Sequence, residues 1–224
     1  MLKKGLLLFI MVASSLSQSI EAKDSTALLN LSNKNMTYNL FLPKDRLRNK
    51  SSKPVEEGKI AFSVNSEYLV IRLEFQDSSI IANGDRNQMH HNELGDVCEI
   101  FLKPVNSSYY WELFITPKNK QSSFLWFGQG KPGKNEGKEN LIKLISKVNK
   151  TSTGWNALVK IPIKELEQRG DKFLLNGSWA TLIARQNFTN IVDKKHRELS
   201  SFPQINRTNF HATDQYIKII NKKK

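Results

Sequence analysis

Residues Gly95–Asn119, GDVCEIFLKPVNSSYYWELFITPKN, decide which fold this chain can adopt. Two runs within this stretch, Asp96–Lys103 and Tyr109–Thr116, alternate apolar and polar residues with the two-residue period of a half-buried β-strand. The residues between the two runs, Pro104–Ser108, are of the types that favour a turn. The stretch therefore predicts a β-hairpin.

Two acidic residues of this hairpin, Glu99 and Glu112, lie among apolar neighbours in paired strands. A carboxylate in such a place needs a cation or several hydrogen-bond donors to offset the loss of its hydration. The other interpretation is that each carboxylate lies at the rim of the sheet and is bonded to a loop. The residues themselves leave both interpretations open.

Short alternating runs surround the hairpin on both sides. They predict further strands over residues 38–42, 60–64, 68–75, 124–127, 141–148, 155–161, 178–185 and 215–220. Only Pro162–Gln168 indicates a helix, so one short helix at most is expected. Short strands separated by turns, almost without helix, predict an all-β fold, an antiparallel β-sandwich.

The N-terminus has the pattern of a secretory signal. Lys3 and Lys4 precede the apolar run Gly5–Ala13, and small and polar residues follow as far as Ala22. The apolar run is too short to span a bilayer as a permanent helix. The sequence thus predicts a signal peptide over residues 1–22, a single β-sandwich domain over residues 23–224, no membrane span, and a secreted protein, extracellular or periplasmic.

The chain is strongly basic, with 34 Lys and Arg against 21 Asp and Glu and a formal net charge of +13. Such an excess favours association with an anionic glycan or a cell envelope, and solubility is an equally good explanation. Export argues against nucleic acid as the partner. The one cysteine, Cys98, cannot form an intramolecular disulfide, and its place in an apolar strand favours a buried, unreactive thiol.

The hairpin also resembles the central hairpin of family 9 carbohydrate-binding modules. In that family an acidic-Val-x-Glu strand ending in Pro is followed by a strand that begins Tyr-Tyr. Further matches stand in the same order along this chain: YLVIRLEFQDSSI at 68–80, GWNALVKIPIKEL at 154–166, WATLIARQNFTN at 179–190 and SFPQINRTNFHATDQYIKI at 201–219. The resemblance covers most of residues 39–220. It implies a β-sandwich that binds carbohydrate.

Sugar recognition requires flat aromatic faces for the C–H side of a pyranose and planar polar side chains for its hydroxyl groups. Trp126 precedes a glycine-rich loop, and a polar triplet ends the run at 178–185. The predicted ligand-binding residues are Trp126, Phe127, Arg185, Gln186, Asn187 and Phe210. The alternatives are a core aromatic at Trp126 and a solvated strand end at the triplet.

The resemblance implies two further features of the site. Family members hold a terminal sugar between two tryptophans, whereas the later loops here offer only Phe202 or Phe210 in place of the second one. Family members also bind structural calcium. Loop carboxylates are the available oxygen ligands here, although their spacing matches no known calcium loop; the candidates are Asp77, Asp85 and Asp96.

Catalysis has little support in the sequence. It contains no Gly-x-Ser-x-Gly, His-Glu-x-x-His or phosphate-loop motif. The sequence therefore predicts a non-catalytic carbohydrate-binding protein, either acting alone or as an accessory to a glycoside hydrolase. The alternative is a secreted b-type haem domain for electron transfer, which uses the same architecture, with Met89-His90-His91 and His211 as candidate ligands.

Overall fold

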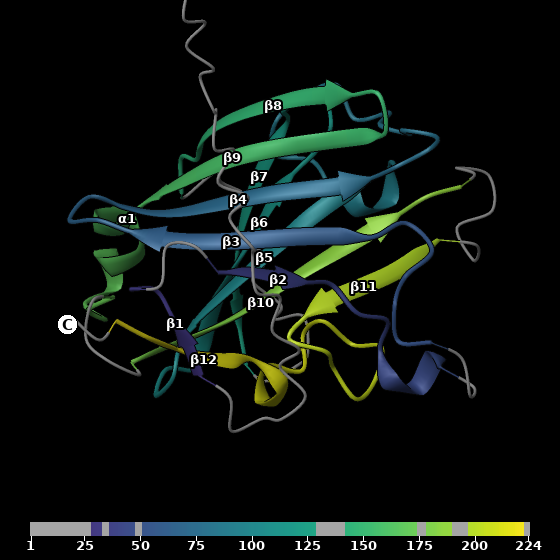
Figure 1. Cartoon of the computed structure of the whole chain (residues 1–224). Coiled ribbons are helices and arrows are strands. Elements are labelled where there is room, and N and C mark those ends of the chain that lie inside the picture. The colour runs from purple at the N-terminus through teal and green to yellow at the C-terminus, as the bar shows by residue number, and fades with distance from the viewer. Residues whose placement is uncertain are drawn as a thin grey trace, which may run out of the picture.

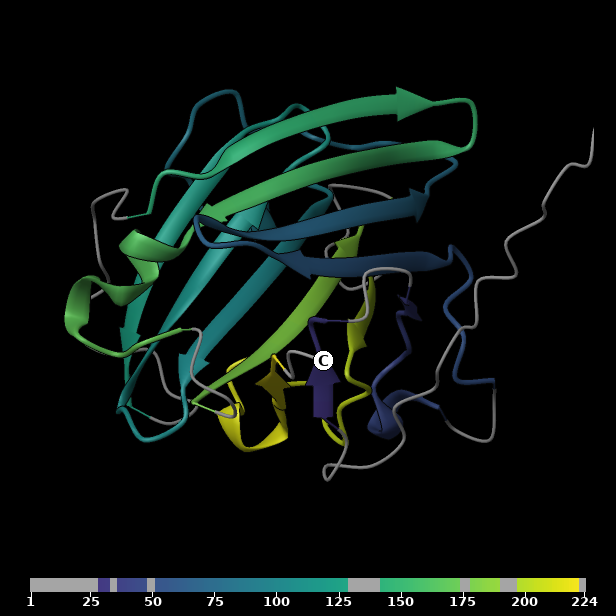
Figure 2. The ribbon, with the colours of Figure 1, turned by 60° about the vertical axis from the view of Figure 1, so that its left-hand side comes forward.

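The computed structural model describes residues 28–32, 36–47, 51–128, 142–173, 178–189 and 197–221. These residues form two β-sheets packed face to face, with the strands of one sheet running obliquely behind those of the other (Figures 1 and 2). The arrangement confirms the predicted antiparallel β-sandwich. The predicted signal peptide, residues 1–22, lies outside the described residues.

The larger sheet has seven strands in the order β1-β12-β10-β5-β6-β7, and β11 also pairs with β10. The strands are β1 (Leu28–Asn30), β5 (Val97–Pro104), β6 (Tyr109–Ile115), β7 (Gln121–Phe127), β10 (Trp179–Asn187), β11 (Glu198–Phe202) and β12 (Ile217–Ile220). Strands β5 and β6 are the hairpin predicted from the sequence. The short strands β1 and β11 had not been predicted.

The smaller sheet has five strands in the order β2-β3-β4-β9-β8. They are β2 (Thr37–Asn39), β3 (Gly58–Val64), β4 (Tyr68–Gln76), β8 (Ile145–Thr151) and β9 (Gly154–Pro162). The helix α1 (Ile163–Leu166) follows β9 and continues into a 3-10 turn, η3 (Glu167–Arg169). It is the only α-helix in the described part of the chain, and no helix there is long and apolar enough to cross a membrane.

The main core lies between the two sheets. Trp111 of β6 and Trp155 of β9 are each 1% exposed, and burial of such a side chain stabilises the fold by roughly 1.5–3 kcal/mol. Cys98 is also buried there as a free thiol, which confirms its predicted place. Aromatic rings pack edge to face across this layer, for example Phe75 against Trp155 at 4.7 Å.

A second apolar cluster covers the outer face of the seven-stranded sheet. Phe101, Tyr110 and Phe114 lie on this face and are buried together with Ile205 and Phe210, from the segment that follows β11. Every residue of β5, β6 and β10 is therefore buried. In β4, by contrast, inward residues are buried while outward residues are exposed or half-buried, so the outer face of the five-stranded sheet is open to solvent.

Candidate functional site

A line of polar side chains crosses the outer face of the seven-stranded sheet beneath this cover. Four neighbouring strands, β10, β5, β6 and β7, each contribute one residue, and each residue is displaced by two positions along the sheet from the one before. We call this set the polar diagonal; its members are Gln186, Glu99, Glu112 and Trp126. Diagonal neighbours of this kind have backbones roughly 7–8 Å apart, so their side chains meet.

Two hydrogen bonds join the polar diagonal into pairs. The amide nitrogen of Gln186 donates to a carboxylate oxygen of Glu99, and the indole nitrogen of Trp126 donates to Oε2 of Glu112 at 2.5 Å. All four side chains are at most 6% exposed. Each glutamate is thus buried and accepts a hydrogen bond, so of the two interpretations that the sequence left open, the rim charge is wrong.

Two groups of the polar diagonal, the carboxyl group of Glu99 and the amide oxygen of Gln186, could form hydrogen bonds with a ligand. Burial raises the pKa of Glu99 to about 7, although the bond from Gln186 and the charge of Arg197 act in the opposite direction. The other amide atom, Oε1 of Gln186, is buried and has no hydrogen-bond partner in the described part of the chain. A buried acceptor without a partner is costly, and a hydroxyl group of a ligand would satisfy it.

The ring of His211 packs against the aromatic side chains at the Trp126 end of the polar diagonal. The half-buried ring of His211 lies 5.1 Å from the ring of Trp126 and 5.6 Å from that of Phe101, and its Nδ1 is bonded to the hydroxyl group of Tyr110 at 2.8 Å. Carboxylates, an amide and ring edges together are the groups that bind hydroxyl and C–H groups of a sugar.

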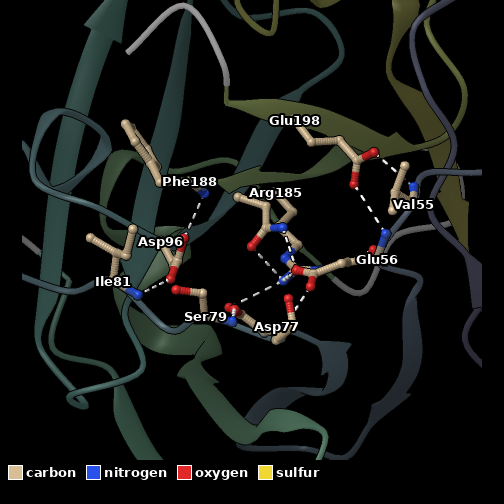
Figure 3. Close-up of polar contacts among 11 residues, drawn as sticks. Val55, Glu56, Asp77, Ser79, Ile81, Asp96, Arg185, Phe188 and Glu198 are labelled. Carbon is tan, nitrogen blue, oxygen red and sulfur yellow. Dashed lines mark hydrogen bonds and ion pairs between the residues drawn. The ribbon is translucent and has the colours of Figure 1, made fainter. Parts of the chain in front are cut away.

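A second polar group, the Arg185 network, lies on the other side of the same sheet, between the sheets (Figure 3). Arg185 is 1% exposed, and its guanidinium group donates to the backbone oxygen of Glu56 at 3.0 Å and to Oδ1 of Asn187 at 2.7 Å. It also forms an ion pair with Asp77 at 3.3 Å and lies 4.9 Å from the ring of Phe75. The network ties the loops before β3 and after β4 to β10.

The residues that the sequence predicted to form one sugar site are divided between the polar diagonal and the Arg185 network. Trp126 and Gln186 lie on the outer face with Phe210, whereas Arg185 and Asn187 point to the opposite side and are engaged in the Arg185 network. The predicted convergence of Trp126 with Arg185 and Asn187 is therefore wrong. The cause is the two-residue period of a strand, which sends Gln186 and its two neighbours to opposite faces.

The remaining predicted aromatics also divide. Phe127 is 37% exposed at the end of β7, where the guanidinium group of Arg169 lies 5.4 Å from its ring. Phe202, the suggested substitute for a second tryptophan, is fully buried against Tyr38 in the core between the sheets. Only Phe210 shares a face with Trp126, and it packs on Phe101 at 6.4 Å.

The three aspartates predicted as calcium ligands do not form one site. Asp77 faces Arg185, while the carboxylate of Asp96 accepts backbone N–H groups of Phe188 at 2.7 Å and of Ile81 at 2.5 Å. Asp85 is exposed and is paired with its neighbour Arg86. Among the described residues no group of three His, Cys, Asp or Glu side chains is arranged to hold a metal ion. The charge of Arg185 instead balances Asp77, and calcium binding stays a prediction.

The histidines suggested as haem ligands have other contacts in this structure. His91 is buried inside its own loop, and burial lowers its pKa to about 4. The ring of His90 stacks on Phe124 at 4.9 Å, and His211 is bonded to Tyr110. The haem alternative stays a prediction.

The raised pKa of Glu99 predicts a pH-dependent stability. Between its ordinary value near 4.5 and about 7, the unfolded chain loses this proton while the folded protein keeps it, so stability falls as pH rises through this range. We expect Glu99→Gln to change stability little at pH 4.5 and to raise it at pH 8 by up to about 3 kcal/mol. Urea unfolding of both proteins across this range measures the difference, and parallel curves would contradict the prediction.

Comparisons with known proteins concern the fold. No family model matches the sequence, and no curated protein matches it by sequence. A crystal structure of a protein from Bacteroides uniformis, provisionally described as carbohydrate-binding, is similar with a TM-score of 0.63 and 11% identity over 92% of this chain and 97% of that one.

Two structures of a family 9 carbohydrate-binding module from Caldicellulosiruptor kristjanssonii are also similar, both with a TM-score of 0.51 over 82% of this chain. The complex with glucose is 12% identical over 85% of its chain, and the complex with cellotriose is 13% identical over 83% of its chain. This chain therefore has the fold of family 9 carbohydrate-binding modules.

Proposed function

We propose that this protein binds a carbohydrate at the polar diagonal and does not turn it over. The observation that carries the proposal is the pairing of Glu99 with Gln186 and of Glu112 with Trp126 in a buried, aromatic setting, where Oε1 of Gln186 has no hydrogen-bond partner among the described residues. Sugar hydroxyl groups both donate and accept hydrogen bonds. They can therefore satisfy carboxylates and an amide at the same time.

The neighbouring structures support carbohydrate as the class of ligand. The two modules of similar fold hold glucose and cellotriose, and the Bacteroides protein is described as carbohydrate-binding. The basic and apolar N-terminal sequence, Met1–Ala22, supports export to a compartment where polysaccharides occur. An accessory role beside a glycoside hydrolase is compatible with such a location.

The polar diagonal is enclosed in this structure, so a ligand needs a way in. His211 is a covering residue that could move, because it is half-buried and belongs to the irregular segment between β11 and β12. A rotation of this ring away from Trp126 would uncover the indole face for stacking. The bond between His211 and the hydroxyl group of Tyr110 would then open as the ligand enters.

The proposal predicts retention of a glycan without its degradation. The protein should bind at least one member of a panel of neutral polysaccharides and oligosaccharides, measured by a glycan array and by calorimetry. Prolonged incubation with that glycan should release no reducing ends. Sustained release would instead show that the protein is a glycoside hydrolase, a class that uses two carboxyl groups. A visible absorption spectrum of the purified protein tests the haem alternative.

A further inference from the structure

The outer face of the five-stranded sheet carries a set of cations that the proposed sugar site does not use. The strand register places Lys59 of β3, Arg72 of β4 and Lys160 of β9 on this face, each displaced by two residues from the one before. Lys147 of β8 lies on the same face, opposite Leu158. We call these four residues the basic face.

The basic face is open and short of compensating charge. Lys59, Arg72 and Lys147 are exposed and Lys160 is half-buried, and none of the four forms an ion pair with another described residue. The strand residues on this face include one carboxylate, Glu74, opposite Lys59. Cations on this diagonal have backbones roughly 7–8 Å apart, so they present a spaced row of positive charge rather than a single site.

The surface between these cations suits a polymer that lies flat. Half-buried Val70 and Leu158 provide aliphatic contacts, and the amides of Asn149 and Asn156 lie in the next row. Two hollows, of about 320 Å³ and 520 Å³, lie on this face. Lys59 lines the first together with the carboxylates of Glu57 and Glu74, whereas Arg72 lines the second without a carboxylate, so the second hollow suits an anionic group better. The only exposed large apolar residue of this face is Ile145, which is too little for insertion into a membrane.

We propose that the basic face is a second binding surface, for an extended anionic polysaccharide with a carboxylate or sulfate group on its repeating units. The guanidinium group of Arg72 would bind such a group through two parallel hydrogen bonds, and the lysines would act as point charges. This surface carries part of the chain's excess of positive charge, and it lies on the other sheet from the polar diagonal.

Binding to polygalacturonate, with its fully methyl-esterified form as the uncharged match, tests the proposal. We expect the full protein to bind the acidic polymer, with an affinity that falls as NaCl rises, and not to bind the ester. The triple variant R72Q/K147Q/K160Q should bind about 3- to 100-fold more weakly, the range for three exposed charge contacts.

The control K44Q/K118Q/K218Q removes the same net charge from exposed positions outside the basic face and should keep full affinity. Equal losses in both triple variants would show that only net charge matters and would overturn the proposal, as would a lack of binding to polygalacturonate. Binding only to vesicles of phosphatidylcholine and phosphatidylserine in equal parts would assign the face to a membrane instead. Glu99→Gln should bind the acidic polymer normally, which separates this test from that of the polar diagonal.

Discussion

Replacement of Arg185 by methionine is expected to lower the free energy of unfolding by about 3–5 kcal/mol, the cost of leaving a buried charge without its partner. Arg185 is 1% exposed and forms an ion pair with Asp77, whose side chain is equally buried. Burial already raises the pKa of Asp77, against the lowering effect of Arg185. The carboxylate would therefore be destabilised further without the guanidinium group. Urea unfolding at pH 7.5 measures the loss.

Two further variants make this experiment specific. Arg207→Met removes an arginine whose ion pair with Asp214 is exposed on both sides, and it should cost less than about 1 kcal/mol. The double variant D77N/R185M removes the uncompensated carboxylate and should recover part of the lost stability. A cost for Arg185→Met as small as that for Arg207→Met would show that the network is not a stabilising element.

The double variant E99M/Q186M is expected to weaken glycan binding strongly without loss of stability. Removal of two central polar contacts should weaken the affinity at least about 30-fold, which corresponds to roughly 2 kcal/mol. Because both partners of a buried hydrogen bond disappear together, no donor or acceptor is left unpaired between them, and stability at pH 7 should be unchanged or higher. Methionine keeps the length of both side chains, so the packing is preserved.

A loss of affinity without a loss of stability would identify the polar diagonal as a binding site. Calorimetric titration gives the affinity, and thermal unfolding gives the stability. The control E67M/Q168M replaces the same residue types at exposed positions outside the site and should bind like the natural protein. Unchanged binding by E99M/Q186M would place the sugar site elsewhere, and unfolding of this variant would show that the pair is structural.

Most of the architecture could be predicted because it depends on local pattern. The strands β3, β4 and β9 follow from alternating residues that meet the core every second position. The hairpin of β5 and β6 could be predicted from its two strand-like runs around a turn, although both of its faces are buried. Strand β1 has only three residues, and it exists because β12, almost two hundred residues later, offers it an edge. Such long-range pairing has no counterpart in the sequence around Leu28.

The candidate site was only half predictable for a related reason. The sequence indicates that Glu99 and Glu112 need hydrogen-bond donors. The donors come from β10 and β7, however, and the sequence of one strand does not determine its register with a neighbouring strand. One error was avoidable. The sequence already shows Arg185, Gln186 and Asn187 as consecutive strand residues, and the alternation of a strand excludes a common face. The cover formed by the segment around Phe210 depends on tertiary contacts.

The parallel pairing of β1 with β12 has a mechanical consequence. Leu28 lies beside Lys218 and Asn30 beside Ile220, and the amide of Leu31 donates to the carbonyl oxygen of Ile220 at 2.9 Å. Tension applied through the two ends of the described chain therefore acts along these strands in opposite directions. It strains their hydrogen bonds together in shear, whereas an antiparallel hairpin pulled from its open end would separate one bond at a time. Resistance to stretching thus begins at this edge of the sandwich, and the force at which the edge gives way depends on an unfolding rate rather than on equilibrium stability.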